Sequence, residues 1–183
     1  MRSSVGAAAV EFAILAPLFF MITFGAITAA ITFYNQNQIT TAAREGARYG
    51  ATLRTTDTVT PAGCAGAQGF LWACSVLNVT VNAAFGDLGP TVTGRYVCVS
   101  LVTGSGAGTI YNPGGAPGNY GAQVTGNGAV TLRSTPCYND GGADGNQRVQ
   151  VVTQKQGQIN AVLFQVTPNI TAHASAKHEE EGT

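Results

Sequence analysis

The stretch FAILAPLFFMITFGAITAAITFY, from Phe12 to Tyr34, contains no charged side chain. As an α-helix rising about 1.5 Å per residue it reaches roughly 34 Å, enough to cross the hydrocarbon core of a bilayer. A helix on the surface of a soluble core would show a polar face, whereas this stretch is apolar all round. The sequence therefore predicts a membrane-spanning helix, bent or loosened at Pro17 and Gly25, which a membrane tolerates.

A cleaved secretory signal peptide is the alternative for this stretch. Its apolar core would be shorter and its cleavage site would follow that core, and the small residues of AITAA (26–30) leave this alternative open. The preceding MRSSVG is very short and carries a single arginine. Charge counting does not fix the orientation: Arg2 favours a cytoplasmic N-terminus, but three arginines follow the other end, Arg44, Arg48 and Arg54.

Composition restricts the possible functions. A chain of 183 residues suits one modest domain plus an anchor. Charged residues make up 10% of the chain and the formal net charge is zero, so no basic field attracts nucleic acid. The abundance of Gly, Thr, Asn and Gln is common in extracellular proteins.

Cysteine spacing predicts two disulfides. The four cysteines, Cys64, Cys74, Cys98 and Cys137, all follow the apolar stretch. An even number in an exported region indicates disulfide pairing, and three pairings are possible. We favour Cys64–Cys74, which closes a short loop, and Cys98–Cys137; buried free thiols are the alternative. No Cys-x-x-Cys pair or zinc-finger histidine spacing occurs, so no metal site is expected.

The residues GAAAVE (6–11) resemble the processing site of type IV prepilins, where a short basic leader ends in Gly and a Glu stands fifth after the cut. The apolar stretch and AAREGARYGA (42–51) resemble the TadE-like family of the Flp (tight adherence) pilus system. The resemblance covers roughly residues 5 to 54, with a looser similarity at ITAHASAKHE (170–179).

The resemblance implies a leader over residues 1–6, cleavage between Gly6 and Ala7, and a transmembrane, pilin-like helix over residues 7–54. Many type IV prepilins have Phe after the cut, whereas this chain has Ala7. It also implies that the freed Ala7 amine of one subunit pairs with Glu11 of its neighbour, which would offset the cost of a carboxylate in lipid. The alternative is that Glu11 lies in the headgroup layer.

The segment after the apolar stretch is expected to continue the helix. Small residues recur there at steps of three and four, and Arg44, Glu45 and Arg48 stand among them. We assign these three residues to helix packing, either within an assembly or against the following sheet. The alternative is an arginine pair that faces lipid headgroups.

Residues 55–178 are expected to form a β-rich domain outside the cytoplasm, followed by an acidic tail over 179–183. Alternating patterns predict strands at 75–83, 95–102, 148–153 and 169–177, with a short element at 160–164. A Gly- and Pro-rich stretch, 104–128, predicts a long exposed loop in which Tyr111 and Tyr120 could offer contact surface. The expected fold class is α+β: a long N-terminal helix followed by a small antiparallel sheet.

No catalytic residue, cofactor or small-molecule substrate is predicted. GSGAGT (104–109) lacks the last glycine of a dinucleotide loop, and YNDGGADGN (138–146) has turn chemistry rather than EF-hand spacing. Thr171, His173, Ser175 and Lys177 alternate along a strand as a solvated face, without the other parts of a hydrolase site. The chain is not expected to be an enzyme.

The expected function is that of a minor pilin or pseudopilin, with its N-terminus in the cytoplasm and its domain beyond the inner membrane. The implied partners are other pilin subunits, the inner-membrane assembly machinery, prepilin peptidase and membrane lipid. The alternative is an adhesin that keeps the same anchor and binds surface ligands through the β domain.

Overall fold

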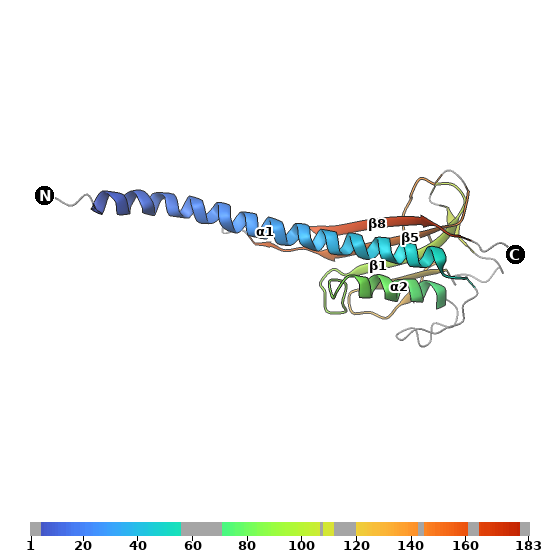
Figure 1. Cartoon of the computed structure of the whole chain (residues 1–183). Coiled ribbons are helices and arrows are strands. Elements are labelled where there is room, and N and C mark those ends of the chain that lie inside the picture. Colours follow the sequence, from blue (N-terminus) through green and yellow to red (C-terminus); the bar gives the residue numbers. More distant parts are fainter. Residues whose placement is uncertain are drawn as a thin grey trace.

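The chain begins with helix α1 (Val5–Thr52), which runs without a break through Pro17. Figure 1 shows the N-terminal part of α1 projecting alone and its C-terminal part lying along the folded domain. The computed structural model of the chain describes residues 5–55, 71–106, 108–111, 120–142, 145–160 and 165–179. Two of the predictions, the disulfide partner Cys64 and most of the short element 160–164, therefore lie outside the described residues.

The domain combines a second helix with an antiparallel sheet. Its main sheet has the strand order β4-β3-β1-β5-β8, β2 pairs with the end of β1, and β6 and β7 form a separate hairpin. The expected α+β fold, a long N-terminal helix followed by a small antiparallel sheet, is confirmed. The elements after α1 are α2 (Leu71–Ala83), β1 (Tyr96–Thr103), β2 (Thr109–Ile110), β3 (Gly121–Thr125), β4 (Thr131–Leu132), β5 (Arg148–Gln156), β6 (Ile159–Asn160), β7 (Gln165–Val166) and β8 (Asn169–Lys177).

The strand predicted over residues 75–83 is wrong, because these residues belong to helix α2. Their alternation of apolar and polar side chains suggested a strand, and valine favours one locally. In the structure every residue from Trp72 to Leu77 is buried, as is Thr80, and α2 contacts α1, β1 and β3. Burial of successive residues does not fit a strand with one solvated face.

The stretch 104–128 is not a continuous exposed loop as predicted. It contains β2 and β3, and β3 pairs with β1 from Gly121↔Ser100 to Thr125↔Tyr96. Ala122 and Val124 of β3 are buried in the core. The predicted strands at 95–102, 148–153 and 169–177 correspond to β1, β5 and β8.

The core lies between the sheet and the two helices. Alternate strand residues such as Val97, Val99 and Val151 are fully buried on the helix side. A buried hydroxyl also joins helix to sheet, since Thr153 Oγ1 donates a hydrogen bond of 3.0 Å to the Ile39 carbonyl of α1. The C-terminal part of α1 is therefore a core element of the domain.

The end of α1 is held by groups from distant parts of the chain. The Leu53 carbonyl accepts a hydrogen bond of 3.2 Å from Trp72 Nε1 and lies 3.2 Å from His178 Nε2. The Glu179 N–H donates to the Ala51 carbonyl at 3.1 Å. Carbonyls at a helix C-terminus have no partner within the helix, so these contacts satisfy them and fix the helix end to α2 and to the chain after β8.

Candidate functional site on helix α1

The projecting segment of α1, residues 9–38, has an apolar surface that is largely exposed. Every large apolar side chain from Val10 to Tyr34 is exposed, with Phe12 at 70% and Ile14 at 72%. Within the described residues, α1 is the one helix long and apolar enough to cross a membrane. An apolar surface of this size is stable only when lipid or other helices cover it.

Hydroxyl groups in this segment are satisfied without water. Thr23 Oγ1 donates to the Phe19 carbonyl at 2.9 Å, and Thr28 Oγ1 donates to the Phe24 carbonyl at 2.8 Å. Each bond spans one helical turn, so the polar atom is paired inside its own helix. The threonines therefore do not oppose an apolar environment.

Glu11 stands near the start of this segment with its side chain exposed. It has no hydrogen bond or ion pair within the described part of the chain. Gly6 and Ala7, the predicted processing site, lie in the first turns of α1, and Ala7 is one helical turn before Glu11. A carboxylate in an apolar layer needs a partner, and the structure leaves that position open to another molecule.

The small residues of AREGARYGA pack inside the same chain. Ala42, Ala43 and Ala47 are buried against the domain. A side-chain carbon added at Gly50 would lie 2.9 Å from Val149 Cγ1 and 3.2 Å from Trp72 Cζ2. Close approach of backbone to side chain therefore requires glycine here. Of the alternatives that the sequence left open for these small residues, the structure shows packing against the domain that follows.

Arg44, Glu45 and Arg48 do not join this packing, since all three are exposed on α1. Arg44 stands ten residues after Tyr34, which places it about 15 Å along the helix beyond the apolar stretch. This is farther than the headgroup layer that borders the hydrocarbon core. The structure therefore leaves these three side chains exposed beyond the apolar stretch.

The opposite face of the sheet is covered by an irregular segment, residues 133–142, which we call the outer strap. Cys137 of the strap forms a disulfide with Cys98 of β1, with a Cα–Cα distance of 5.8 Å, as favoured from the sequence. The Cys137 N–H donates to Ser100 Oγ at 3.2 Å. Cys74 in α2 is also disulfide-bonded.

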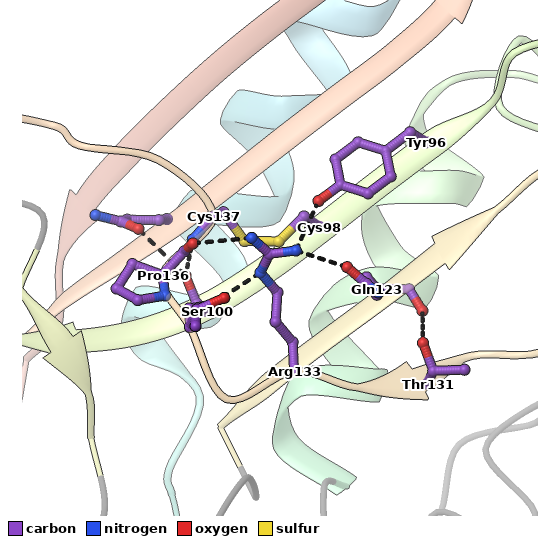
Figure 2. The surroundings of a disulfide bond; sticks show 10 residues. Tyr96, Cys98, Ser100, Gln123, Thr131, Arg133, Pro136 and Cys137 are labelled. Atoms are coloured by element: carbon purple, nitrogen blue, oxygen red, sulfur yellow. Dashed lines mark hydrogen bonds between the residues drawn. A yellow bond between two sulfur atoms is a disulfide. The ribbon is translucent and has the colours of Figure 1, made fainter.

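Arg133 forms hydrogen bonds with several groups at one end of the outer strap (Figure 2). Its guanidinium donates to Gln123 Oε1 at 2.7 Å, to Tyr96 Oη at 3.1 Å and to the Pro136 carbonyl at 3.1 Å. Its Nε donates to the Thr135 carbonyl at 2.8 Å. One arginine therefore joins the strap to β1 and β3.

Arg148 fastens the other end of the strap. Its Nε and Nη2 donate to the two carboxylate oxygens of Asp140 at 2.9 and 3.0 Å, and Nη1 donates to the Gly104 carbonyl at 2.9 Å. Burial alone raises the pKa of the Asp140 carboxyl, but side-chain and backbone hydrogen bonds, the first of them from Arg148, together with the positive charge of Arg148 lower that pKa below its ordinary value. The sequence shows no sign of the contacts with Tyr96 and Gly104, because these partners are 37 and 44 residues away from their arginines.

The other sequence motifs that were weighed as functional sites make contacts within the domain. Asp140 is engaged by Arg148, and the glycine-rich loop at 104–106 offers its carbonyls to the same arginine. His173 stacks on Tyr138 of the strap with ring centroids 4.8 Å apart, while Ser175 is exposed. No group of three potential metal ligands occurs among the described residues.

Tyr111 and Tyr120 are half-buried rather than displayed. Their rings lie 5.3 Å apart, and Tyr120 also packs at 6.1 Å from Trp72. Burial raises the pKa of the Tyr120 hydroxyl, which donates to the Thr55 carbonyl at 3.4 Å. The two rings therefore pack against the edge of the core.

Comparison with known proteins gives one match. Residues 6–48 match the family model described as TadE-like protein. The match confirms the resemblance identified from the sequence, and it covers the projecting segment together with the first part of the packed helix. No curated protein and no solved structure was found to match the chain.

Proposed function

We propose, on the premise that the segment matched to TadE-like proteins works as it does in that family, that this chain is a minor pilin or pseudopilin. It inserts in the bacterial inner membrane through α1 and takes part in assembly of a Flp (tight adherence) pilus used for surface adherence. The observation that carries the proposal is the coincidence of the family match with the exposed apolar half of α1.

Processing between Gly6 and Ala7 supplies the partner that Glu11 lacks. The new amine at Ala7 is positive at neutral pH, and pairing with Glu11 of a neighbouring subunit offsets the cost of each charge in lipid. Pairing of this kind favours side-by-side packing of the apolar helices, which is the step that builds a pilus or its base.

The domain lies on the periplasmic or extracellular side in this proposal, and the N-terminus is cytoplasmic. The Cys98–Cys137 disulfide supports that orientation, because such bonds persist in oxidising compartments. The exposed side chains of Arg44, Glu45 and Arg48 are then available to neighbouring subunits just outside the membrane. The partners are other pilin subunits, the inner-membrane assembly machinery, prepilin peptidase and lipid, and no enzymatic role is assigned.

Intact-mass and N-terminal analysis of the protein from its native membrane tests the proposal. A mature chain that starts at Ala7 is expected, and a Gly6→Val variant should retain residues 1–6. A chain that starts near residue 31 in both forms would show an ordinary secreted protein and contradict the proposal.

A further inference from the structure

The β5–β8 hairpin extends beyond the main sheet and runs beside α1. After β5 ends, its continuation and the segment that precedes β8 are joined by a hydrogen bond of 2.8 Å from the Gly157 N–H to the Pro168 carbonyl. The same two segments then form β6 and β7. Four further residues at about 3.3 Å each carry this extension roughly 13 Å past the end of β5. Figure 1 shows this hairpin lying along α1, on the side where the helix projects.

The extension contacts the apolar part of α1. Ile159 of β6 borders an open hollow of about 500 Å³ whose other lining residues all belong to α1. Those lining residues are Gly25, Ala29, Thr32, Phe33 and Gln36. The hairpin is therefore level with the last turns of the stretch that spans the membrane in the proposed function.

The part of α1 beside the hairpin lies near the interface of the bilayer when α1 spans it as proposed. A hydrocarbon core needs about 20 helical residues, so a span counted from Phe12 ends near Ile31. Thr32, Phe33 and Gln36 then lie in the layer that contains the headgroups, while Gly25 and Ala29 lie in the adjoining end of the hydrocarbon core, so the hollow crosses the boundary between the two. A two-stranded hairpin has unpaired backbone groups at its edges, which water and headgroups in this layer can satisfy and hydrocarbon cannot.

The chemistry of the hairpin fits that layer. No residue from Gln156 to Asn169 is charged. Ile159 of β6 pairs with Val166 of β7, which brings two aliphatic residues together across the hairpin. Val166 is 46% exposed although it is aliphatic.

We propose that the β6–β7 hairpin is a second membrane contact, resting in the outer interfacial layer with Ile159 and Val166 toward the acyl chains. It would hold the domain at a fixed height and tilt beside α1. The inference depends on insertion of α1 as proposed above. A neighbouring subunit is the other occupant that such a surface could have, and the test below separates the two.

Tryptophan fluorescence of the full chain tests this contact in vesicles of phosphatidylethanolamine and phosphatidylglycerol, with and without bromine near the top of the acyl chains. The variants are Val166→Trp and, as the matched control, Leu132→Trp. Leu132 is 51% exposed, close to the exposure of Val166, but it lies in the edge strand β4. The native Trp72 is 2% exposed and gives a common background.

The Val166→Trp variant should show a blue-shifted emission and a several-fold larger loss of intensity in brominated vesicles than the Leu132→Trp variant. Equal quenching of the two variants overturns the inference. So does a Val166→Trp signal shielded from both brominated lipid and aqueous iodide, because that result assigns the surface to a neighbouring protein.

Co-flotation of the wild-type chain with the same vesicles separates this inference from the proposed function. Failure to float contradicts membrane insertion of α1 and the hairpin contact together. Flotation without selective quenching of the Val166→Trp variant overturns the hairpin contact alone.

Discussion

Gly46 of α1 lies directly against Thr80 of α2, so closely that a side-chain carbon added at Gly46 would overlap Thr80 Oγ1. Thr80 is fully buried, and its hydroxyl donates to the Val76 carbonyl at 2.8 Å. The side chain therefore cannot move aside without losing that bond. This contact sets the distance between the two helices.

The Gly46→Ala variant should be less stable than the wild type. Overpacking costs about 1–3 kcal/mol, and the better helix propensity of alanine returns about 1 kcal/mol, so a net loss of up to about 2 kcal/mol is expected. Denaturant unfolding of the full chain in detergent, followed by circular dichroism, measures the loss.

Two variants control this experiment. Gly25→Ala adds the same carbon where nothing lies within 4 Å, and it should leave domain stability unchanged. Adding Thr80→Ala to Gly46→Ala should recover part of the loss, giving a favourable coupling energy in a double-mutant cycle. A Gly46→Ala variant as stable as the wild type would mean that the helices separate easily.

Asp140 should make the folding stability of the domain depend on pH. Its carboxyl has a lower pKa in the folded chain than its ordinary value of 3.8, because several hydrogen bonds and the charge of Arg148 together outweigh burial. The folded state therefore binds this proton less readily than the unfolded state. The stabilisation is complete well above pH 3.8 and is lost as pH falls through the lowered folded pKa.

Unfolding midpoints measured from neutral pH down through this window test that expectation. The Asp140→Asn variant should be less stable than the wild type at neutral pH, and the gap should narrow as the pH falls below about 3.8. A gap that stays constant over the whole range would rule out the Asp140–Arg148 pair as the titrating element.

Removing the Cys98–Cys137 disulfide should destabilise the domain. The bond spans 39 residues, and loop-closure entropy for that length corresponds to about 4 kcal/mol. The Cys98→Ala/Cys137→Ala variant is expected to unfold at lower denaturant, measured without reductant so that Cys74 stays bonded. An unchanged midpoint would show that Arg133 and Arg148 alone hold the outer strap.

Replacing Glu11 by glutamine should abolish or strongly reduce pilus formation while leaving the protein in the membrane. The neutral amide cannot form an ion pair with the Ala7 amine, which follows from the proposed function. Pili are counted by electron microscopy, and membrane content is measured by immunoblot. Glu179→Gln removes an exposed acid far from the apolar segment and serves as the control. Normal pili in the Glu11→Gln strain would refute the pairing.

The parts of the fold that were predicted correctly depend on local patterns. A charge-free run defines α1, and strict alternation defines β1, β5 and β8 because one face of the sheet meets the helices. Helix α2 was missed because Val76, Val79 and Val81 favour a strand on their own. Its helical form is selected by contact with α1, above all at Gly46 and Gly50, and such tertiary contacts overrule weak local preferences.

The candidate site was predictable where its residues are close in sequence. Gly6, Ala7 and Glu11 form one short motif, so local spacing alone is enough to recognise it. The outer strap could not be predicted, because Arg133 joins Tyr96, which stands 37 residues away, and Arg148 reaches back 44 residues to Gly104. A single sequence contains no signal for such pairings.

The uninterrupted course of α1 has a consequence for angular alignment. Consecutive helical residues are rotated by about 100°, so the direction that Glu11 faces in the bilayer is locked to the side on which α1 meets the sheet. One residue added between Tyr34 and Ile39 would turn the whole domain by that angle around the helix axis. In the pilus of the proposed function, subunits would therefore need the same number of residues in this connecting stretch, because their domains would otherwise point in different directions around the fibre.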